Sequence, residues 1–75
     1  MIETGEIITL DNNKEYICFS TLEHEGKHYL YLISNFKPLE IRFGIQTMEN
    51  GEISIEIINE QQEKQKVLSL FQNKM

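Results

Sequence analysis

Cysteine, proline and glycine are scarce in this chain, and each scarcity excludes something. The 75 residues include one cysteine, one proline, four glycines and no tryptophan. One cysteine, Cys18, excludes an intramolecular disulfide and a CxxC or Cys/His zinc motif, and it fits a reducing compartment. So little glycine and proline argues against a long disordered linker. We therefore expect a single domain over residues 1–75, with a thin core.

Positive charge is also in short supply. The chain has twelve acidic and seven basic residues, so its net charge is −5, and the lysines and the arginine are scattered along the sequence. Binding to a phosphate backbone needs clustered basic side chains, so nucleic acid is not the expected partner. The longest apolar run covers residues 29–33, whereas a membrane span needs roughly 20 residues. With no basic and apolar leader at the N-terminus, we expect a cytoplasmic protein with no membrane partner.

Residues with β-propensity gather in five segments that turn signals separate. The sequence predicts strands at about 6–10, 15–23, 28–34, 39–48 and 52–58. A helix is predicted at about 60–72, with Asn59 as its N-cap and Gln62 at the N3 position of a capping box. The helix carries an apolar stripe of Val67, Leu68, Leu70, Phe71 and Met75. The expected fold class is α+β, mostly β: a five-stranded antiparallel meander, strongly twisted or a half-open small barrel, with one C-terminal helix.

The last hairpin allows two registers. A two-residue Asn50-Gly51 loop would place Glu49 opposite Glu52, which brings like charges together. A three-residue loop that includes Glu49 would place apolar residues of the two strands on one face. We therefore predict the three-residue loop, with Ile45 opposite Ile55 and Phe43 opposite Ile57. The same reasoning predicts a three-residue His24-Glu25-Gly26 loop, with Glu23 opposite Lys27 and Phe19 opposite Tyr31.

The five strands differ in how apolar residues are distributed. In the last two strands we expect one apolar face (Ile41, Phe43, Ile45, Ile53, Ile55 and Ile57) and one wet face (Glu40, Arg42, Gln46, Ser54 and Glu56). In the second and third strands both faces are apolar: Ile17, Phe19, Tyr31 and Ile33 on one, and Tyr16, Cys18, Leu22, Leu30 and Leu32 on the other. Both faces then need cover, from a curled sheet and from the helix. If the helix is too short, the remaining apolar surface is a binding or dimer surface.

No motif indicates catalysis or a metal. His24 and His28 flank a turn with only Glu23 or Glu25 as a further ligand, so we interpret them as surface histidines. Cys18 lies among apolar strand residues, which favours a buried, inert thiol. No nucleophile elbow, glycine-rich phosphate loop or cleft for paired carboxylates is present. We expect no enzyme activity, no catalytic residue, no cofactor and no metal.

Several motifs, taken in order, resemble a known family. They are Gly5-Glu-Ile-Ile-Thr-Leu10, Lys14-Glu-Tyr16, Glu25-Gly-Lys-His-Tyr29-Leu-Tyr-Leu32, an Asn-Gly hairpin and a short terminal helix ending at Leu70-Phe71. Together they resemble the short acidic proteins of unknown function from low-GC Gram-positive bacteria (YrzB-like domain of unknown function). The resemblance implies a cytoplasmic bacterial protein and supplies no activity.

The sequence leads to two functional hypotheses. The first is a small non-enzymatic protein-binding or regulatory module that acts on an unknown protein partner or by self-association. The alternative is a small barrel that binds single-stranded nucleic acid through aromatic side chains. The candidate interaction residues are Phe19, Tyr29, Tyr31 and Phe36. Strand aromatics more often pack in a core, so the protein-binding hypothesis is preferred.

Overall fold

The computed structural model describes residues 2–74 and contains the predicted elements in the predicted order. These are β1 (Ile7–Thr9), β2 (Glu15–His24), β3 (Lys27–Ser34), β4 (Ile41–Glu49), β5 (Glu52–Ile57) and α1 (Gln61–Lys74). The first strand is shorter than expected and the helix is shifted toward the C-terminus. The first bond of α1 runs from the Lys64 amide to the Glu60 carbonyl, so Glu60 stands at the N-cap in place of Asn59. Met75 of the predicted stripe lies outside the described residues.

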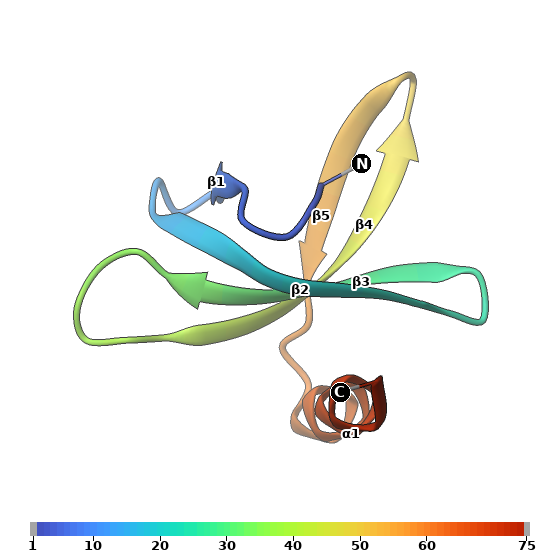
Figure 1. Ribbon diagram of the computed structural model, residues 1–75. Coiled ribbons are helices and arrows are strands. Elements are labelled where there is room, and N and C mark those ends of the chain that lie inside the picture. Colours follow the sequence, from blue (N-terminus) through green and yellow to red (C-terminus); the bar gives the residue numbers. More distant parts are fainter. Residues whose placement is uncertain (1, 75) are drawn as a thin grey trace.

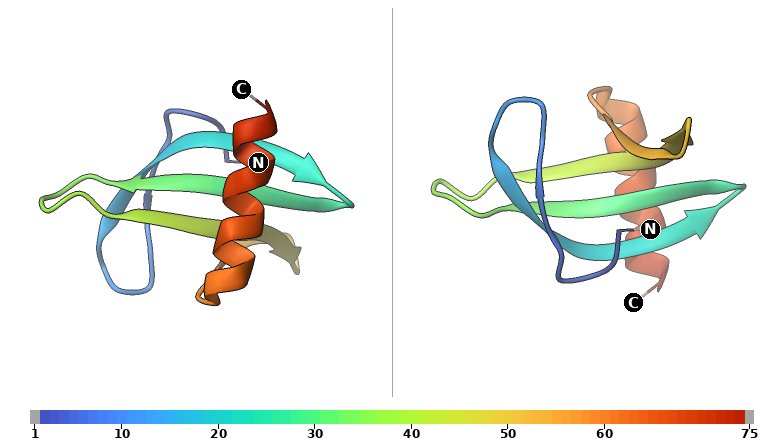
Figure 2. Two further views of the ribbon diagram at one scale, coloured as in Figure 1. Left: turned by 90° about the horizontal axis from the view of Figure 1, so that it is seen from below. Right: turned by 90° about the horizontal axis from the view of Figure 1, so that it is seen from above.

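The strands form one antiparallel sheet in the order β1-β2-β3-β4-β5. β1 and the outer part of the β4–β5 hairpin rise on the same side of the central strands (Figure 1), so the sheet curls into a half-barrel. α1 crosses the opposite side of the sheet (Figure 2). This arrangement confirms the predicted fold class. We call the face onto which β1 and β5 curl the concave face, and the face that α1 contacts the convex face.

Each face of the sheet has its own apolar cluster, because both faces of the central strands are apolar. The concave cluster consists of Ile2, Tyr16, Cys18, Leu30 and Leu32, with Ile8, Leu10, Phe36, Ile55 and Ile57 packed against it. The convex cluster consists of Tyr29, Phe43, Ile58, Val67 and Phe71, with Leu22, Tyr31, Ile45, Leu68 and Leu70 at its border. The curled sheet covers the first cluster and α1 covers the second, as expected.

Both predicted hairpin registers are wrong by one residue. The loops are the two-residue pairs Glu25-Gly26 and Asn50-Gly51, and all four of these residues have positive φ angles. Two positive φ angles define a type I′ turn, whose twist matches that of the flanking strands. Glu49 therefore stands opposite Glu52. Both carboxylates are exposed to solvent, which screens their repulsion and lets turn geometry decide the register.

This shift overturns the prediction of one apolar and one wet face in β4 and β5. Phe43 and Ile45 lie on the convex face, whereas Ile55 and Ile57 pack against the concave cluster. Arg42 and Gln46, expected on a wet face, alternate with Phe43 and Ile45 and so lie on the concave side. The split leaves both pairs packed, because Phe43 and Ile45 join the convex cluster and Ile55 and Ile57 join the concave one.

A bulge in β2 corrects the pairing of the first hairpin. The register shifts between Cys18 and Ser20, so that Cys18 pairs with Leu32 and Ser20 with Tyr31. A bulge inserts one extra residue, here Phe19, and reverses the alternation of side chains beyond it. Leu22 therefore joins the convex cluster, and not the face of Leu30 to which its parity had assigned it. The Phe19 and Tyr31 rings still meet, with centroids 5.2 Å apart, although Phe19 is not the cross-strand partner of Tyr31.

Candidate interaction surface

A row of four isoleucines crosses the convex face. Ile7 pairs with Ile17, Ile17 with Ile33, and Ile33 with Ile41. Residues in direct register on neighbouring strands project from the same side of a sheet. Tyr31 and Tyr29, two and four residues before Ile33 in β3, belong to the cluster beneath α1, so the row lies on the same convex face. We call Ile7, Ile17, Ile33 and Ile41 the isoleucine row.

The isoleucine row is open to solvent at both ends. Ile7 is 57% exposed and Ile41 is 46% exposed, and the two inner members are half-buried. Two further large apolar residues with high exposure lie near the row in sequence: Phe19, two residues after Ile17, and Leu39, two residues before Ile41. Single exposed apolar residues are ordinary on a protein surface, but a contiguous set marks an interaction site.

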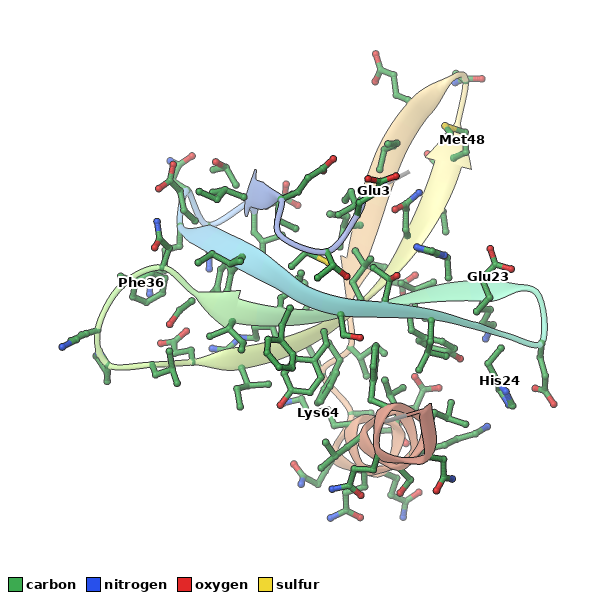
Figure 3. All side chains as sticks on the ribbon, in the orientation of Figure 1. Glu3, Glu23, His24, Phe36, Met48 and Lys64 are labelled. Atoms are coloured by element: carbon green, nitrogen blue, oxygen red, sulfur yellow. The ribbon has the colours of Figure 1, made fainter. Side chains whose placement is uncertain are left out.

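The row lies beside α1 because the helix covers only part of the convex face. Seen from below, α1 crosses the central strands, and the part of the sheet that leads to the 35–40 loop extends beyond it (Figure 2). Phe71 of α1 contacts the rings of Tyr31 and Phe43, with centroids 5.4 and 6.0 Å apart. Lys64 lies on the flank of α1 that borders the open part of the sheet (Figure 3). The open strip thus has the sheet as its floor and α1 as one wall.

The width of the strip follows from strand geometry. α1 rests on the rows that contain Tyr29 and Tyr31, and the isoleucine row is the next one along the strands. Rows on one face are about 6.7 Å apart, so the isoleucine row lies about 10 Å from the middle of the two covered rows. Packed helices have axes about 8–10 Å apart. A second helix would therefore fit on the isoleucine row, directly beside α1.

The four candidate interaction residues from the sequence divide between the two faces. Phe19 and Tyr31 lie next to the isoleucine row, and the Tyr31 ring also contacts Phe43 at 5.0 Å. Tyr29 is buried in the convex cluster beneath α1. Phe36 belongs to the concave side, where its ring meets Tyr16 edge-on at 5.6 Å. The four aromatics do not form one platform.

Arg42, the only arginine of the chain, is paired with a carboxylate. Arg42 donates to the Glu40 carboxylate at 2.9 Å and to the Ile41 carbonyl at 3.0 Å. The Tyr16 hydroxyl donates to the same carboxylate oxygen at 3.2 Å. The lysine ammonium that approaches Phe36 belongs to Lys14, 5.1 Å from the ring centroid. These contacts tie Arg42 to the Glu40 carboxylate and place Lys14 beside Phe36.

The two histidines differ in their environments. His24 is partly exposed, as expected for a turn residue, but the His28 side chain is only 15% exposed because it lies on β3, between β2 and β4. The interpretation of His28 as a surface residue is therefore wrong. Its Nδ1 is 3.7 Å from a Glu23 oxygen, and neither ring nitrogen has a hydrogen-bond partner within residues 2–74. In that range no group of three or more His, Cys, Asp or Glu could hold a metal ion.

Two other sequence expectations concern Cys18 and a membrane span. Cys18 is fully buried in the concave cluster, as predicted, and its thiol donates to the Ser20 carbonyl at 3.6 Å. Over residues 2–74, no helix is both long and apolar enough to cross a bilayer.

Sequence reasoning missed the isoleucine row as a unit. It placed Ile17 and Ile33 on one face and Ile41 on the inner face of another hairpin, and it gave Ile7 no role. The signal that finds the row is register: once β1, β2, β3 and β4 are aligned, the four isoleucines coincide. Register depends on the bulge and the turns, which composition does not reveal.

Comparison with known proteins adds no relative: no protein-family model, no curated protein and no solved structure matches this chain. The resemblance to the YrzB-like proteins therefore rests on the sequence motifs alone.

Proposed function

We propose that this chain is a non-enzymatic, cytoplasmic protein-binding module that receives an amphipathic helix of a partner protein on the isoleucine row. The observation that carries the proposal is the isoleucine row beside α1, whose two end residues are exposed. Docking a helix into an apolar groove is a common mode of protein recognition. A family assignment to the YrzB-like proteins is part of the same proposal.

The strip also limits the length and charge of the partner helix. Three steps between neighbouring strands, from β1 to β4, cover about 14 Å, which corresponds to about ten helical residues. The partner would place apolar residues at positions i, i+3, i+4 and i+7 on the isoleucine row. Lys64 on the wall of the strip favours an acidic residue on the flank of the partner helix that faces α1.

A second copy of the chain fits the strip less well. α1 stands about 10 Å above the convex face, which keeps the sheet of another copy away from the row. The solvent side of α1 is polar, with exposed Gln61, Gln62, Glu63, Gln65 and Lys66, so α1 of another copy presents no second apolar stripe. These features favour a helix from a different protein.

The proposal is tested by nuclear magnetic resonance with a stapled helical peptide of about twelve residues, which has leucines at i, i+3, i+4 and i+7 and glutamates on one flank. We expect shifts centred on the amides of Ile17, Ile33 and Ile41. The variant Ile41→Glu should abolish them, and Thr47→Glu, an exposed position in the same strand, is the control.

Three results would overturn the proposal. One is an unchanged spectrum at millimolar peptide, and another is binding that Ile41→Glu leaves intact. The third is a concentration-dependent dimer, detected by light scattering after size exclusion, that Ile41→Glu dissociates. Lys64→Glu should weaken binding of the acidic peptide by about 2- to 5-fold, as expected for one exposed charge pair. Lys66→Glu changes the net charge equally and serves as its control.

A further inference from the structure

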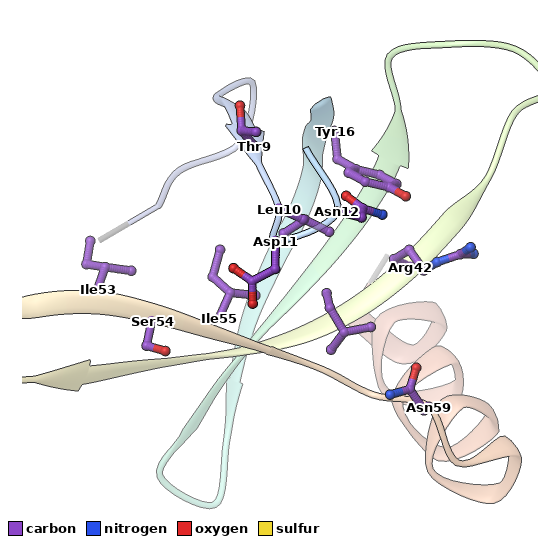
Figure 4. A pocket seen from close by; sticks show the side chains of 11 residues that line it. Thr9, Leu10, Asp11, Asn12, Tyr16, Arg42, Ile53, Ser54, Ile55 and Asn59 are labelled. Atoms are coloured by element: carbon purple, nitrogen blue, oxygen red, sulfur yellow. The ribbon is translucent and has the colours of Figure 1, made fainter. Parts of the chain in front are cut away.

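The half-barrel has a gap between its two edge strands, β1 and β5, on the side opposite α1. These strands are the two ends of the sheet order, and within residues 2–74 no strand pairing joins them. A groove of about 450 Å³ lies in the gap (Figure 4). Its lining consists of Thr9, Leu10, Asp11, Asn12, Tyr16, Arg42, Ile53, Ser54, Ile55, Ile57 and Asn59. The groove uses none of the residues of the isoleucine row.

The outer edge of β5 presents backbone groups to this groove. The Ile58 amide donates to the Phe43 carbonyl, and antiparallel pairs alternate between hydrogen-bonded and non-hydrogen-bonded positions. Counting back from Ile58, residues 56 and 54 direct their backbone groups toward β4. The N–H and C=O groups of Ile53, Ile55 and Ile57 therefore point away from β4. Such an edge is a template for another strand.

The side chains of β5 give the edge two distinct faces. Ile53, Ile55 and Ile57 lie toward the concave side, and Ile53 is 45% exposed. Glu52, Ser54 and Glu56 alternate with them and are exposed on the other side. Asp11 lies across the groove, and the charge of Arg42 is already matched by Glu40. β5 therefore presents isoleucines toward the groove on one face and the carboxylates of Glu52 and Glu56 on the other.

We propose that β5 accepts an extended segment of a partner protein as a sixth strand, which fills the gap between β5 and β1. The apolar residues of this segment face the concave side over Ile53 and Ile55, and lysine or arginine residues alternate with them beside Glu52 and Glu56. Backbone hydrogen bonds would supply affinity, and the alternation would supply specificity. A second copy would bring Glu52 and Glu56 of its own edge against these carboxylates, so charge complementarity favours a basic partner.

The test uses the full chain and two ten-residue peptides at low salt, one alternating valine with lysine and one alternating valine with glutamate. We expect the lysine peptide to shift the amides of Ile53, Ile55 and Ile57, and the glutamate peptide to bind at least 10-fold more weakly. The double variant Glu52→Lys, Glu56→Lys should reverse this preference. Equal binding of both peptides would overturn the proposal that the partner segment is basic.

A matched pair of variants separates the backbone contact from the side chain. Ile55→Pro and Ile55→Ala both remove the isoleucine, but only proline also removes the outward N–H. Because that N–H points away from β4, proline is tolerated at this edge position. The lysine peptide should bind Ile55→Pro about 2- to 10-fold more weakly than Ile55→Ala, the equivalent of one hydrogen bond. Equal affinity, or peptide shifts confined to the isoleucine row, would overturn strand addition and leave the helix-docking proposal intact.

Discussion

The two halves of the convex face are both apolar, but one is buried and the other is partly exposed to solvent. One half holds Tyr29, Tyr31 and Phe43 and is sealed by Val67 and Phe71 of α1. The other half holds the isoleucine row, whose ends are exposed to solvent. Both halves come from the same strands and both are apolar, so the covering helix alone distinguishes core from surface. The comparison teaches that a helix of 14 residues can seal part of a curled sheet and leave a strip of one helix width.

Removing the helix should abolish the difference between the halves and produce the largest effect. Deletion of residues 65–75 exposes the convex cluster, and a sheet without a covering element is marginally stable. We expect no cooperative thermal transition by circular dichroism. A cooperative melt in the truncated chain would show that α1 is dispensable for folding.

Truncation of one side chain in the sealed half should have the next largest effect on stability. Phe71 is 1% exposed and contacts the rings of Tyr31 and Phe43. Phe71→Ala should lower the free energy of unfolding by about 3–5 kcal/mol, through lost burial and a new cavity. Urea denaturation measures the change, with the exposed neighbour Gln72→Ala as control. A loss below about 1 kcal/mol would mean that the helix is not tightly seated.

The same substitution in both halves sharpens the comparison. Ile58 is 5% exposed in the convex cluster, whereas Ile41 of the isoleucine row is 46% exposed. Ile58→Val should cost about 0.5–1.5 kcal/mol, and Ile41→Val should change stability by less than about 0.5 kcal/mol. Urea titrations of the two variants measure both changes in the free energy of unfolding. Equal losses at the two sites would show that something already covers the isoleucine row.

The smallest expected effect concerns the hypothesis of nucleic-acid binding. Tyr29 lies beneath α1, Phe36 packs against Tyr16 on the other face, and Arg42 is paired with Glu40. We expect no change of fluorescence anisotropy when the chain is added to labelled single-stranded RNA of mixed sequence. Low salt strengthens any such contact, so saturable binding there would revive the hypothesis.

Sequence patterns predicted the elements better than the surfaces. The strand and helix segments, the burial of Cys18 and the need to cover both faces of β2 and β3 followed from apolar periodicity, because burial requires that periodicity. The register did not follow. Two-residue turns at Asn50-Gly51 and Glu25-Gly26 and the bulge at Phe19 shifted the pairing. A shift of one residue moves every side chain to the other face, so Ile55 and Leu22 were each assigned to the wrong face.

The sequence by itself determined an acidic composition, an antiparallel sheet of five strands and an amphipathic helix after the last strand. These properties depend on composition and on local periodicity, which each segment carries alone. Only the tertiary structure decided that Ile7, Ile17, Ile33 and Ile41 align in one row, that α1 stops short of them, and that β5 keeps an open edge. Those outcomes depend on contacts between residues distant in the chain, where turn geometry and packing together outweigh local preference.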